Sequence, residues 1–445
     1  MFGTSGIRGT VGEEITAELA LSIGRAVASD GYDRVVVGRD ARESGAVLTD
    51  AVTAGLRECG TDVLEVGIAP TPTIARAVPR ANADAGVVVT ASHNPAPDNG
   101  LKLWSASGKA FDPEQLDAIA TRVEGDEYDL RPWDGHGSLE SLEDTTDRHA
   151  AALGEAVSID EPPSVAVDVG NGTGAITARV LSSLGCDIVT LNGQRDGRFP
   201  GRPSEPTQET LDDLSALVEA TDATVGIAHD GDADRMLAVD ETGSFVPKDV
   251  LLALFARETA TDGDVIAAPI DTSMAVDDAL ATVGASVRRT RVGDGFVADC
   301  ATQPDVVFGG EPSGAWIWPD ETLCPDGPLA ACKLVELVAD RGPLSDLVGE
   351  IETYPIRRTS VKIENKETVM NQVRDRIRER YDDVETLDGV HVDVDDGWFL
   401  LRPSGTEPVV RLTAEARDEF RAEQLEADAV GLLESAIATV SDIRP

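Results

Sequence analysis

Short runs of β-branched residues alternate with amphipathic segments of helical period through the first three quarters of the chain. This alternation is typical of βα units, in which helices connect parallel strands and cover the sheet. Strands are predicted at residues 34–37, 63–66, 85–89, 165–169, 188–191, 224–228, 236–239, 265–268, 286–291 and 306–308. Helices are predicted at residues 15–30, 46–59, 175–184, 250–259 and 328–339. The pattern therefore predicts an α/β fold with mixed, largely parallel sheets.

Beyond Tyr354 the pattern changes to closely spaced strands between two helices. Strands are predicted at residues 390–394, 398–401 and 409–414, and helices at residues 367–380 and 418–440. This order favours a smaller α+β domain with an antiparallel sheet. A polar segment at residues 124–144 is expected to connect two domains, and the three α/β units repeat an architecture without repeating a sequence. The predicted domains are residues 1–150, 151–243, 244–353 and 354–445.

The charge is negative along the whole chain. The 445 residues include 81 Asp and Glu against 38 Lys and Arg, of which six are Lys, and the formal charge is −43. An acidic surface with little Lys is expected of a halophilic protein, because concentrated salt screens the self-repulsion. The alternative is a basic partner. The same charge disfavours nucleic acid as a partner, since phosphate binding needs clustered Lys and Arg.

Composition also bears on location. No run approaches the roughly 18–20 apolar residues that span a bilayer, so no membrane partner is expected. The N-terminal MFGTSGIRG has neither the basic nor the apolar region of a secretory signal. Five cysteines are an odd number without CxxC spacing, which argues against a disulfide framework or a structural zinc site. Most of them are expected to fill the core, and the protein is expected to be cytoplasmic.

The run TASHNP, residues 90–95, directly follows the predicted strand at residues 85–89. Ligands of α/β proteins bind where strands end in this way. Ser92 and His93 offer a hydroxyl beside an imidazole. Adjacent side chains on an extended backbone point apart, however, so a serine-hydrolase dyad is a poor interpretation. Considered alone, the loop is better explained as a polar turn.

The run DGDADR, residues 230–235, lies between two predicted strands. Carboxylates at Asp230, Asp232 and Asp234 can converge on a hard cation such as Mg²⁺ or Ca²⁺. An EF-hand is disfavoured because Arg235 stands where that loop needs Gly and because strands, not helices, flank the run. Three ligands leave coordination sites open for phosphoryl chemistry. The alternative is a plain acidic turn.

Two further loops carry groups suited to a sugar phosphate. In GGEPSG, residues 309–314, Glu311 and Ser313 can bind hydroxyl groups, although a glycine-rich turn explains this run better when it stands alone. In RPSGTEP, residues 402–408, a guanidinium, two hydroxyls and a glycine can wrap a phosphate; a simple turn is an equal alternative. The run GNGTGA, residues 170–175, fits a dinucleotide fingerprint. Asn192 stands where an acid should bind the ribose, so dinucleotide binding is disfavoured.

Together, a cation site, a phosphate loop, a sugar loop and a strand-end serine predict phosphoryl transfer to a sugar phosphate. The sequence resembles the α-D-phosphohexomutase superfamily, which includes phosphoglucomutase, phosphomannomutase and phosphoglucosamine mutase. The resemblance extends over essentially the whole chain. It rests on FGTSGIRG, TASHNP, DGDADR, GGEPSG and RPSGTEP, with VGRDARESG, FPGRPSEPTQETL and TRVGDGFV in addition.

The resemblance implies four domains around a central cleft, each contributing one loop. It implies that Ser92 carries a phosphoryl group and, with the three aspartates, binds one Mg²⁺. The serine passes its phosphoryl to a hexose monophosphate, and the resulting 1,6-bisphosphate reorients and returns the other phosphate. Arg8 and Arg235 then balance the phosphate charge. The implied substrate-binding residues are Arg291, Glu311, Ser313, Arg402, Ser404, Gly405, Thr406 and Arg411.

A general base must take the proton of the attacking hydroxyl. This role is assigned to Lys102, which stands where the family has a cationic acid/base group. The alternative is a solvated surface lysine. A base at this position needs a depressed pKa, through burial or a neighbouring cation such as Arg291. His93 is expected to support the phosphoserine loop instead of acting as the base.

One departure from the family pattern is Ala315, where many relatives have His. This departure keeps a non-catalytic sugar-phosphate binder as a second hypothesis, against which the intact Ser92 and acidic triad argue. The length of the chain and its start favour glucosamine phosphate as the substrate. Mannose or glucose phosphate is the alternative. The protein is expected to be a monomer or a homodimer.

Overall fold

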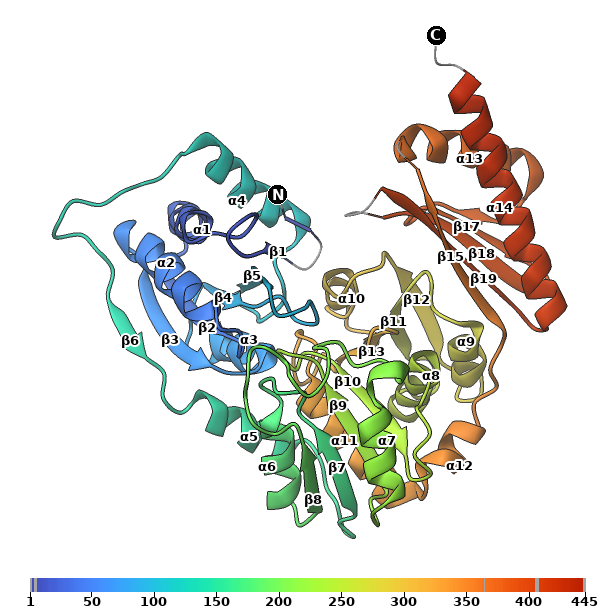
Figure 1. Ribbon diagram of the computed structural model, residues 1–445, viewed down its shortest axis with the longest axis horizontal. Coiled ribbons are helices and arrows are strands. Elements are labelled where there is room, and N and C mark those ends of the chain that lie inside the picture. The colour runs from blue at the N-terminus through green and yellow to red at the C-terminus, as the bar shows by residue number, and fades with distance from the viewer. Residues whose placement is uncertain (1, 4–5, 364, 405–407, 443–445) are drawn as a thin grey trace.

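The computed structural model describes residues 2–3, 6–363, 365–404 and 408–442, which form four sheets with their helices (Figure 1). The first sheet has the strand order β1-β5-β4-β2-β3-β6. Its strands are β1 (Ile7–Thr10), β2 (Arg34–Arg39), β3 (Asp62–Ile68), β4 (Ala85–Val89), β5 (Asp98–Ser105) and β6 (Leu139–Ser141). Its helices are α1 (Ala17–Ser29), α2 (Gly45–Glu58), α3 (Thr71–Arg80), α4 (Pro113–Gly125) and α5 (Thr145–Glu155).

The second and third sheets have four strands each, in the orders β10-β9-β7-β8 and β12-β11-β13-β14. The second contains β7 (Ser164–Asp168), β8 (Asp187–Leu191), β9 (Val225–His229) and β10 (Met236–Asp240), with α6 (Ala175–Ser183), the 3-10 turn η1 (Gln208–Thr210) and α7 (Asp212–Glu219). The third contains β11 (Val265–Pro269), β12 (Ser286–Thr290), β13 (Val306–Glu311) and β14 (Ala315–Ile317). Its helices are α8 (Lys248–Thr259), α9 (Met274–Ala281), α10 (Asp294–Cys300), α11 (Gly327–Arg341) and α12 (Leu344–Gly349).

These three sheets share one topology. In each, three parallel strands are followed by a fourth that pairs antiparallel with the third, which gives the common orders β5-β4-β2-β3, β10-β9-β7-β8 and β14-β13-β11-β12. The loop of that last hairpin is the TASHNP loop in the first sheet, the DGDADR loop in the second and the EPSG turn in the third. The predicted repetition of architecture is therefore present, and it places three of the four candidate loops at equivalent points.

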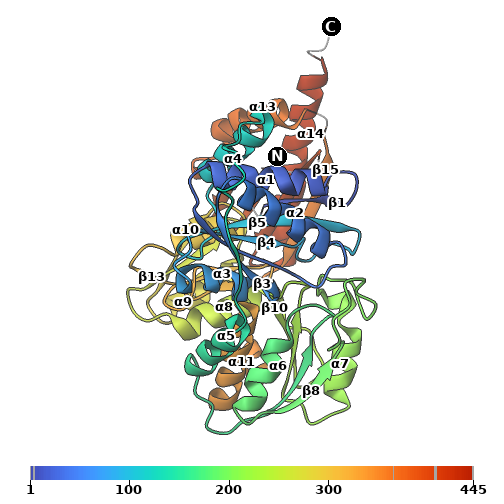
Figure 2. The same cartoon turned by 90° about the vertical axis from the view of Figure 1, so that its left-hand side faces the viewer.

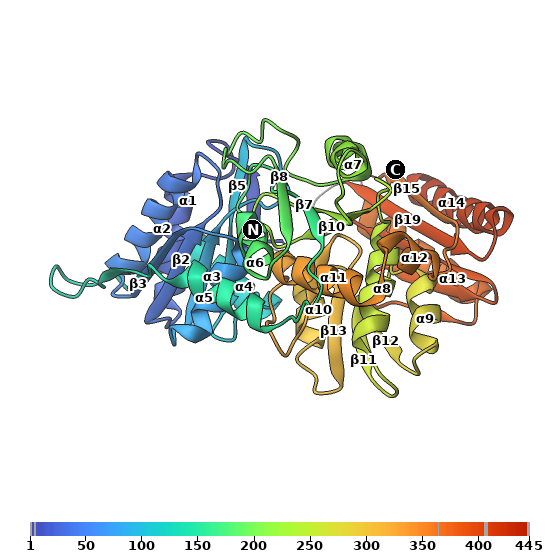
Figure 3. The same cartoon turned by 90° about the horizontal axis from the view of Figure 1, so that it is seen from below.

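The fourth sheet is antiparallel throughout, with the order β15-β19-β18-β17-β16. Its strands are β15 (Ile356–Lys362), β16 (Val384–Glu385), β17 (Val390–Val394), β18 (Gly397–Pro403) and β19 (Val409–Ala416), and its helices are α13 (Lys366–Arg380) and α14 (Glu419–Asp442). Figure 3 shows the units following one another from the N-terminal to the C-terminal part of the chain. The predicted fold of three α/β domains and one α+β domain is confirmed.

Separate apolar cores support the first and last units, whereas the middle two share one. A single buried cluster extends from Leu153 to Tyr354 and includes side chains of α6, α8 and α11. In the view of Figure 2, the first unit lies above the second. Two clusters line the two faces of the first sheet, and a further one lies between the fourth sheet and its helices. The second and third loops are therefore held on a common base.

The sequence prediction omits several elements, of which β5 matters most. The sequence prediction gives the segment containing Lys102 no strand, but this segment is a buried strand between β1 and β4. The polar segment at residues 124–144 contains β6, whose three side chains are all exposed. The helix α4 was also missed, although Asp112 and Gln115 form a capping box and Pro113 occupies the first turn. Among the described residues, none of the helices combines the length and the apolar composition that a bilayer crossing needs.

Candidate active site

Ser92 lies in the loop between β4 and β5, and only 1% of it is exposed. Its φ of +50° is in the left-handed region, which residues other than glycine enter at a cost of about 1–3 kcal/mol. The Ser92 amide donates to Thr90 Oγ1 at 2.8 Å. Backbone strain of this kind is concentrated at functional sites, so the conformation itself marks Ser92 within the loop.

Arg42 holds this loop in place, and it is one of the largest fully buried side chains. Its guanidinium is fixed by Asp40 and stacks over the ring of Phe199, with Cζ 5.1 Å from the ring centroid. Four backbone carbonyls of the loop accept its N–H groups at 2.6–2.9 Å, those of Ser92, Asn94, Pro95 and Asp98. A planar group with five donors is suited to such a site. Sequence reasoning gave Arg42 no role, although it lies within the run VGRDARESG.

We expect Arg42→Lys to lower turnover by about a hundredfold, because a lysine cannot satisfy four carbonyls and a displaced reactive group loses rate steeply. Arg198→Lys is the matched control, since Arg198 pairs with Glu43 at an exposed position nearby. Steady-state rates and thermal unfolding of both variants check this. Wild-type turnover in a folded Arg42→Lys protein would contradict the positioning role.

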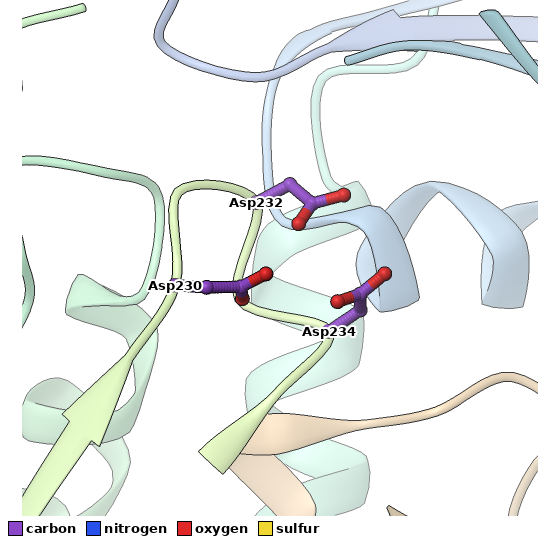
Figure 4. Close-up of side chains that lie close together, drawn as sticks. All are labelled: Asp230, Asp232 and Asp234. Atoms are coloured by element: carbon purple, nitrogen blue, oxygen red, sulfur yellow. The ribbon is translucent and has the colours of Figure 1, made fainter. Parts of the chain in front are cut away.

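The carboxylates of the three aspartates of the second loop lie close together (Figure 4). Asp230, Asp232 and Asp234 are buried, and each offers a carboxylate oxygen within 4.8 Å of the others. Ser92 Oγ donates to Asp230 Oδ2 at 2.7 Å and lies 3.3 Å from Asp234 Oδ1. Thr71, at the start of α3, donates to Asp232 Oδ2 at 2.6 Å. The structure thus brings the predicted serine and the predicted cation site together from two domains.

The electrostatics of the triad suit a bound cation. Burial, followed by repulsion from Asp234 and Asp232, raises the pKa of Asp230 well above its ordinary value. Burial also opposes ionisation of Asp232, but Lys102 and the hydrogen bond from Thr71 outweigh it and lower the pKa of that carboxyl. Asp232 Oδ1 is buried and accepts no hydrogen bond from the described residues. Clustered hard oxygens with one unpartnered atom fit a divalent cation of the Mg²⁺ type.

Lys102, on β5, is buried against the triad with 4% exposed. Its Nζ donates to Asp232 Oδ2 at 3.0 Å and also to Asp234 Oδ2. Burial disfavours the ammonium form, but the two carboxylates outweigh burial and raise the pKa of Lys102. This shift is opposite to the depressed pKa expected of a base. The neighbouring cation that lowers the pKa of Lys102, against this rise, is Arg8 and not Arg291 as the sequence suggested.

Arg8, His93 and Arg235 lie around the same centre. Burial, then Arg235 and Arg8, lower the pKa of His93 to about 2, so the imidazole is neutral. Burial opposes the charge of Arg235, but Asp230 and Asp234 outweigh it and raise its pKa. His93 Nδ1 and Arg8 Nε are buried without a hydrogen-bond partner among the described residues. A neutral His93 is consistent with support of the loop.

The third loop places Glu311 at the end of β13. Ser313 Oγ donates to Glu311 Oε2 at 2.7 Å, and burial followed by repulsion from Asp294 raises the pKa of Glu311. Ala315, the departure from the family pattern, is 5% exposed and bridges to Arg235. Its backbone therefore links the third loop to the second.

A cleft of about 690 Å³ separates the first unit from the last two. Its lining includes five residues that the sequence assigned to substrate binding, which are Arg291, Glu311, Arg402, Ser404 and Arg411. Arg402 lies 3.7 Å from Asp388, and Lys366 Nζ donates to the Ser404 carbonyl. Gly405 and Thr406, assigned to the phosphate loop, lie outside the described residues. These five residues thus share one cleft, whereas Ser313, which contacts Glu311, is not part of its lining.

The fingerprint-like run GNGTGA has a packing role. A Cβ on Gly172 would lie 2.4 Å from the Gly231 carbonyl oxygen, and one on Gly174 would lie 2.7 Å from the His229 ring. These glycines therefore allow the run to pack directly against the DGDADR loop. Arg202 completes this support, since it pairs with Asp168 and donates to the His229 carbonyl at 2.7 Å. Arg202 lies in the run FPGRPSEPTQETL but was given no role.

Comparison with known proteins agrees with this geometry. Four models of phosphoglucomutase/phosphomannomutase domains match in order: the α/β/α domains I, II and III at residues 1–129, 147–243 and 247–354, and the C-terminal domain at residues 359–432. The chain belongs to the phosphoglucomutase/phosphomannomutase family. Its members are phosphohexomutases, a class of isomerase, and this chain is one of them.

Curated relatives in this family are similar over nearly their whole length. A probable phosphoglucosamine mutase of Methanopyrus kandleri is 45% identical over 449 residues, which cover 99% of each chain. One of Methanothermobacter thermautotrophicus is 44% identical over 446 residues, with 98% of each chain covered.

Solved structures are similar over nearly the whole chain. A phosphoglucomutase/phosphomannomutase family protein from Burkholderia thailandensis has a TM-score of 0.88 at 30% identity, with 98% of each chain covered. An Aspergillus fumigatus N-acetylphosphoglucosamine mutase, solved with GlcNAc-6P and magnesium, has a TM-score of 0.59 at 16% identity and covers 98% of this chain and 96% of its own. At that identity the likeness extends to the fold alone.

Proposed function

We propose that this phosphohexomutase interconverts glucosamine 1-phosphate and glucosamine 6-phosphate through a phosphoserine at Ser92. The observation that carries the serine assignment is the contact of Ser92 Oγ with Asp230 and Asp234 inside a buried acidic cluster. The choice of sugar is supported by relatives of 41–45% identity that are named probable phosphoglucosamine mutases.

The reaction needs two phosphoryl transfers. In the first, the bond between phosphorus and Ser92 Oγ breaks while phosphorus bonds to a substrate hydroxyl oxygen, which gives a 1,6-bisphosphate. The proton of that hydroxyl must reach Ser92 Oγ. Lys102 is our candidate carrier, because its Nζ contacts two carboxylates that also border Ser92. After the bisphosphate has turned over, the same steps in reverse return the other phosphate to Ser92.

A Mg²⁺ ion held by Asp230, Asp232, Asp234 and Ser92 would stabilise negative charge on the transferred phosphoryl group. Arg8 and Arg235 add positive charge close to the same carboxylates. His93, neutral and largely buried, supports the loop.

The remaining residues hold the substrate. Glu311 and Ser313 are proposed to bind ring hydroxyls, and Arg291 to contact the substrate from the same wall of the cleft. The phosphate that is not reacting is assigned to Arg402, Ser404, Gly405, Thr406 and Arg411. Charge-assisted bonds from the arginines suit such a dianion.

We further propose the domain limits 1–150, 151–243, 244–353 and 354–445, and a cytoplasmic location as a monomer or homodimer. Support for the location comes from the five cysteines, which are all free in the structure; free thiols are typical of reducing compartments.

Comparison of rates on glucosamine, mannose and glucose 1-phosphates tests the proposed substrate. Each is supplied with Mg²⁺, a trace of its 1,6-bisphosphate and concentrated salt. We expect kcat/KM to be at least about tenfold higher for the glucosamine compound, equivalent to about 1.4 kcal/mol of transition-state binding. A preference for mannose or glucose phosphate would overturn the choice of sugar, and no 6-phosphate from any of the three would overturn the mutase itself.

A further inference from the structure

In two of the triad carboxylates, those of Asp232 and Asp234, one oxygen contacts Lys102 and the other does not. Asp234 directs Oδ2 to Lys102 and places Oδ1 3.3 Å from Ser92 Oγ. Asp232 gives Oδ2 to Lys102 and Thr71, while its buried Oδ1 has no partner among the described residues. Lys102 therefore contacts the Oδ2 atom of both carboxylates and does not contact the Oδ1 atom of either.

The charge of Lys102 matters here because the site has little water to screen it. Asp230 and Asp232 have no measurable exposure, and Asp234 and Lys102 each have 4%. Within the part of the chain that the structure describes, Lys102 is the one basic side chain that lies within 4.0 Å of a triad carboxylate oxygen. At such low exposure, charges a few ångströms apart interact far more strongly than at the surface.

We infer that Lys102 is the built-in counter-cation of the acidic triad and that it competes electrostatically with the divalent cation for Asp232 and Asp234. This inference rests on the metal site of the proposed function and adds a second role for Lys102 to that of proton carrier. The ammonium group stabilises the three clustered carboxylates when no metal is bound. The same positive charge weakens the binding of a divalent cation, so Lys102 sets the affinity of the site.

Two neutral substitutions test the inference by metal binding and not by activity. Lys102→Met removes the charge and keeps the apolar stem, whereas Lys102→Gln removes the charge and keeps a hydrogen-bond donor. We expect both to bind Mg²⁺ at least about tenfold more tightly than the parent protein in isothermal titration calorimetry. We also expect a lower unfolding temperature in chelator and a larger rise on adding Mg²⁺.

Three controls separate charge from other effects. Lys102→Arg keeps a positive charge and should stay within about threefold of the parent affinity. Lys333→Met removes one positive charge from α11, where Lys333 donates to the Ala156 carbonyl, and should leave the affinity unchanged. The phosphorylation of Ser92 must be equal in all samples, because a phosphate adds nearly two negative charges. Intact-mass measurement checks that it is.

Each outcome decides a separate point. Unchanged or weaker Mg²⁺ binding by both neutral variants overturns the counter-cation role while leaving the metal site intact. If Lys102→Met folds only when Mg²⁺ is present, the inference is supported, and Lys102→Gln then supplies the affinity. No Mg²⁺ binding by the parent protein refutes the metal site of the proposed function, and the counter-cation role with it.

Discussion

Ser92→Ala is expected to abolish mutase turnover, with a loss of at least about a thousandfold, while the protein stays folded. The loss follows because alanine lacks the hydroxyl oxygen that contacts Asp230 and Asp234 and that would carry the phosphoryl group in the proposed mechanism. Alanine removes a single hydroxyl from a buried site, so the unfolding temperature should change by no more than a few degrees. A coupled assay for the 6-phosphate and a thermal scan measure both quantities.

Ser107→Ala is the matched control, because Ser107 is an exposed serine close to the far end of the same hairpin. It should retain parent activity. Turnover of Ser92→Ala within tenfold of the parent would refute the phosphoserine assignment, whatever the fate of the other site residues.

Asp230→Asn is expected to have opposite effects on turnover and on stability. Turnover should fall by at least about a hundredfold, because an amide replaces the carboxylate that would bind the cation and that accepts the Ser92 hydroxyl. Stability of the metal-free protein should rise by about 1 kcal/mol or more, since burial and the two neighbouring aspartates disfavour the charged form of Asp230.

The sign of the stability effect follows from the direction of the pKa shift. The pKa of Asp230 is raised in the folded state, so ionisation destabilises the fold, and the destabilisation develops as the pH rises from the ordinary pKa of an aspartate to that raised pKa. Asparagine does not ionise. The advantage of Asp230→Asn in chelator should therefore grow with pH and vanish in acid, as denaturant unfolding at several pH values would show. An advantage that shrinks as the pH rises would contradict this origin. Asp187→Asn, at an exposed position, should show no such pH dependence.

The location of the candidate site could be predicted from sequence because its residues lie in short runs at strand ends. The Asp230, Asp232 and Asp234 spacing indicates a cation site by itself, and the buried strand before Ser92 shows where the loop must lie. The shared hairpin topology then brings two of these loops into contact. Local pattern was sufficient because each loop is the direct continuation of a buried strand.

The residues that hold the loops could not be predicted in this way. Arg42 and Arg202 act on backbone carbonyls that are distant in sequence, and a carbonyl leaves no trace in side-chain pattern. The environment of Lys102 was also out of reach. Its partners come from another domain and reverse the pKa shift that burial alone would produce. Long-range charge, unlike periodicity, depends on the completed fold.

The proposed phosphoryl transfer to Ser92 can be tested directly. The dephosphorylated protein is incubated with Mg²⁺ and glucosamine 1,6-bisphosphate in concentrated salt, and its peptides are then analysed by mass spectrometry. We predict the gain of one phosphoryl group on the peptide that contains Ser92, with release of glucosamine monophosphate and no gain in Ser92→Ala. A phosphoryl group found elsewhere, or none while the 1-phosphate is still converted to the 6-phosphate, would contradict the phosphoserine mechanism.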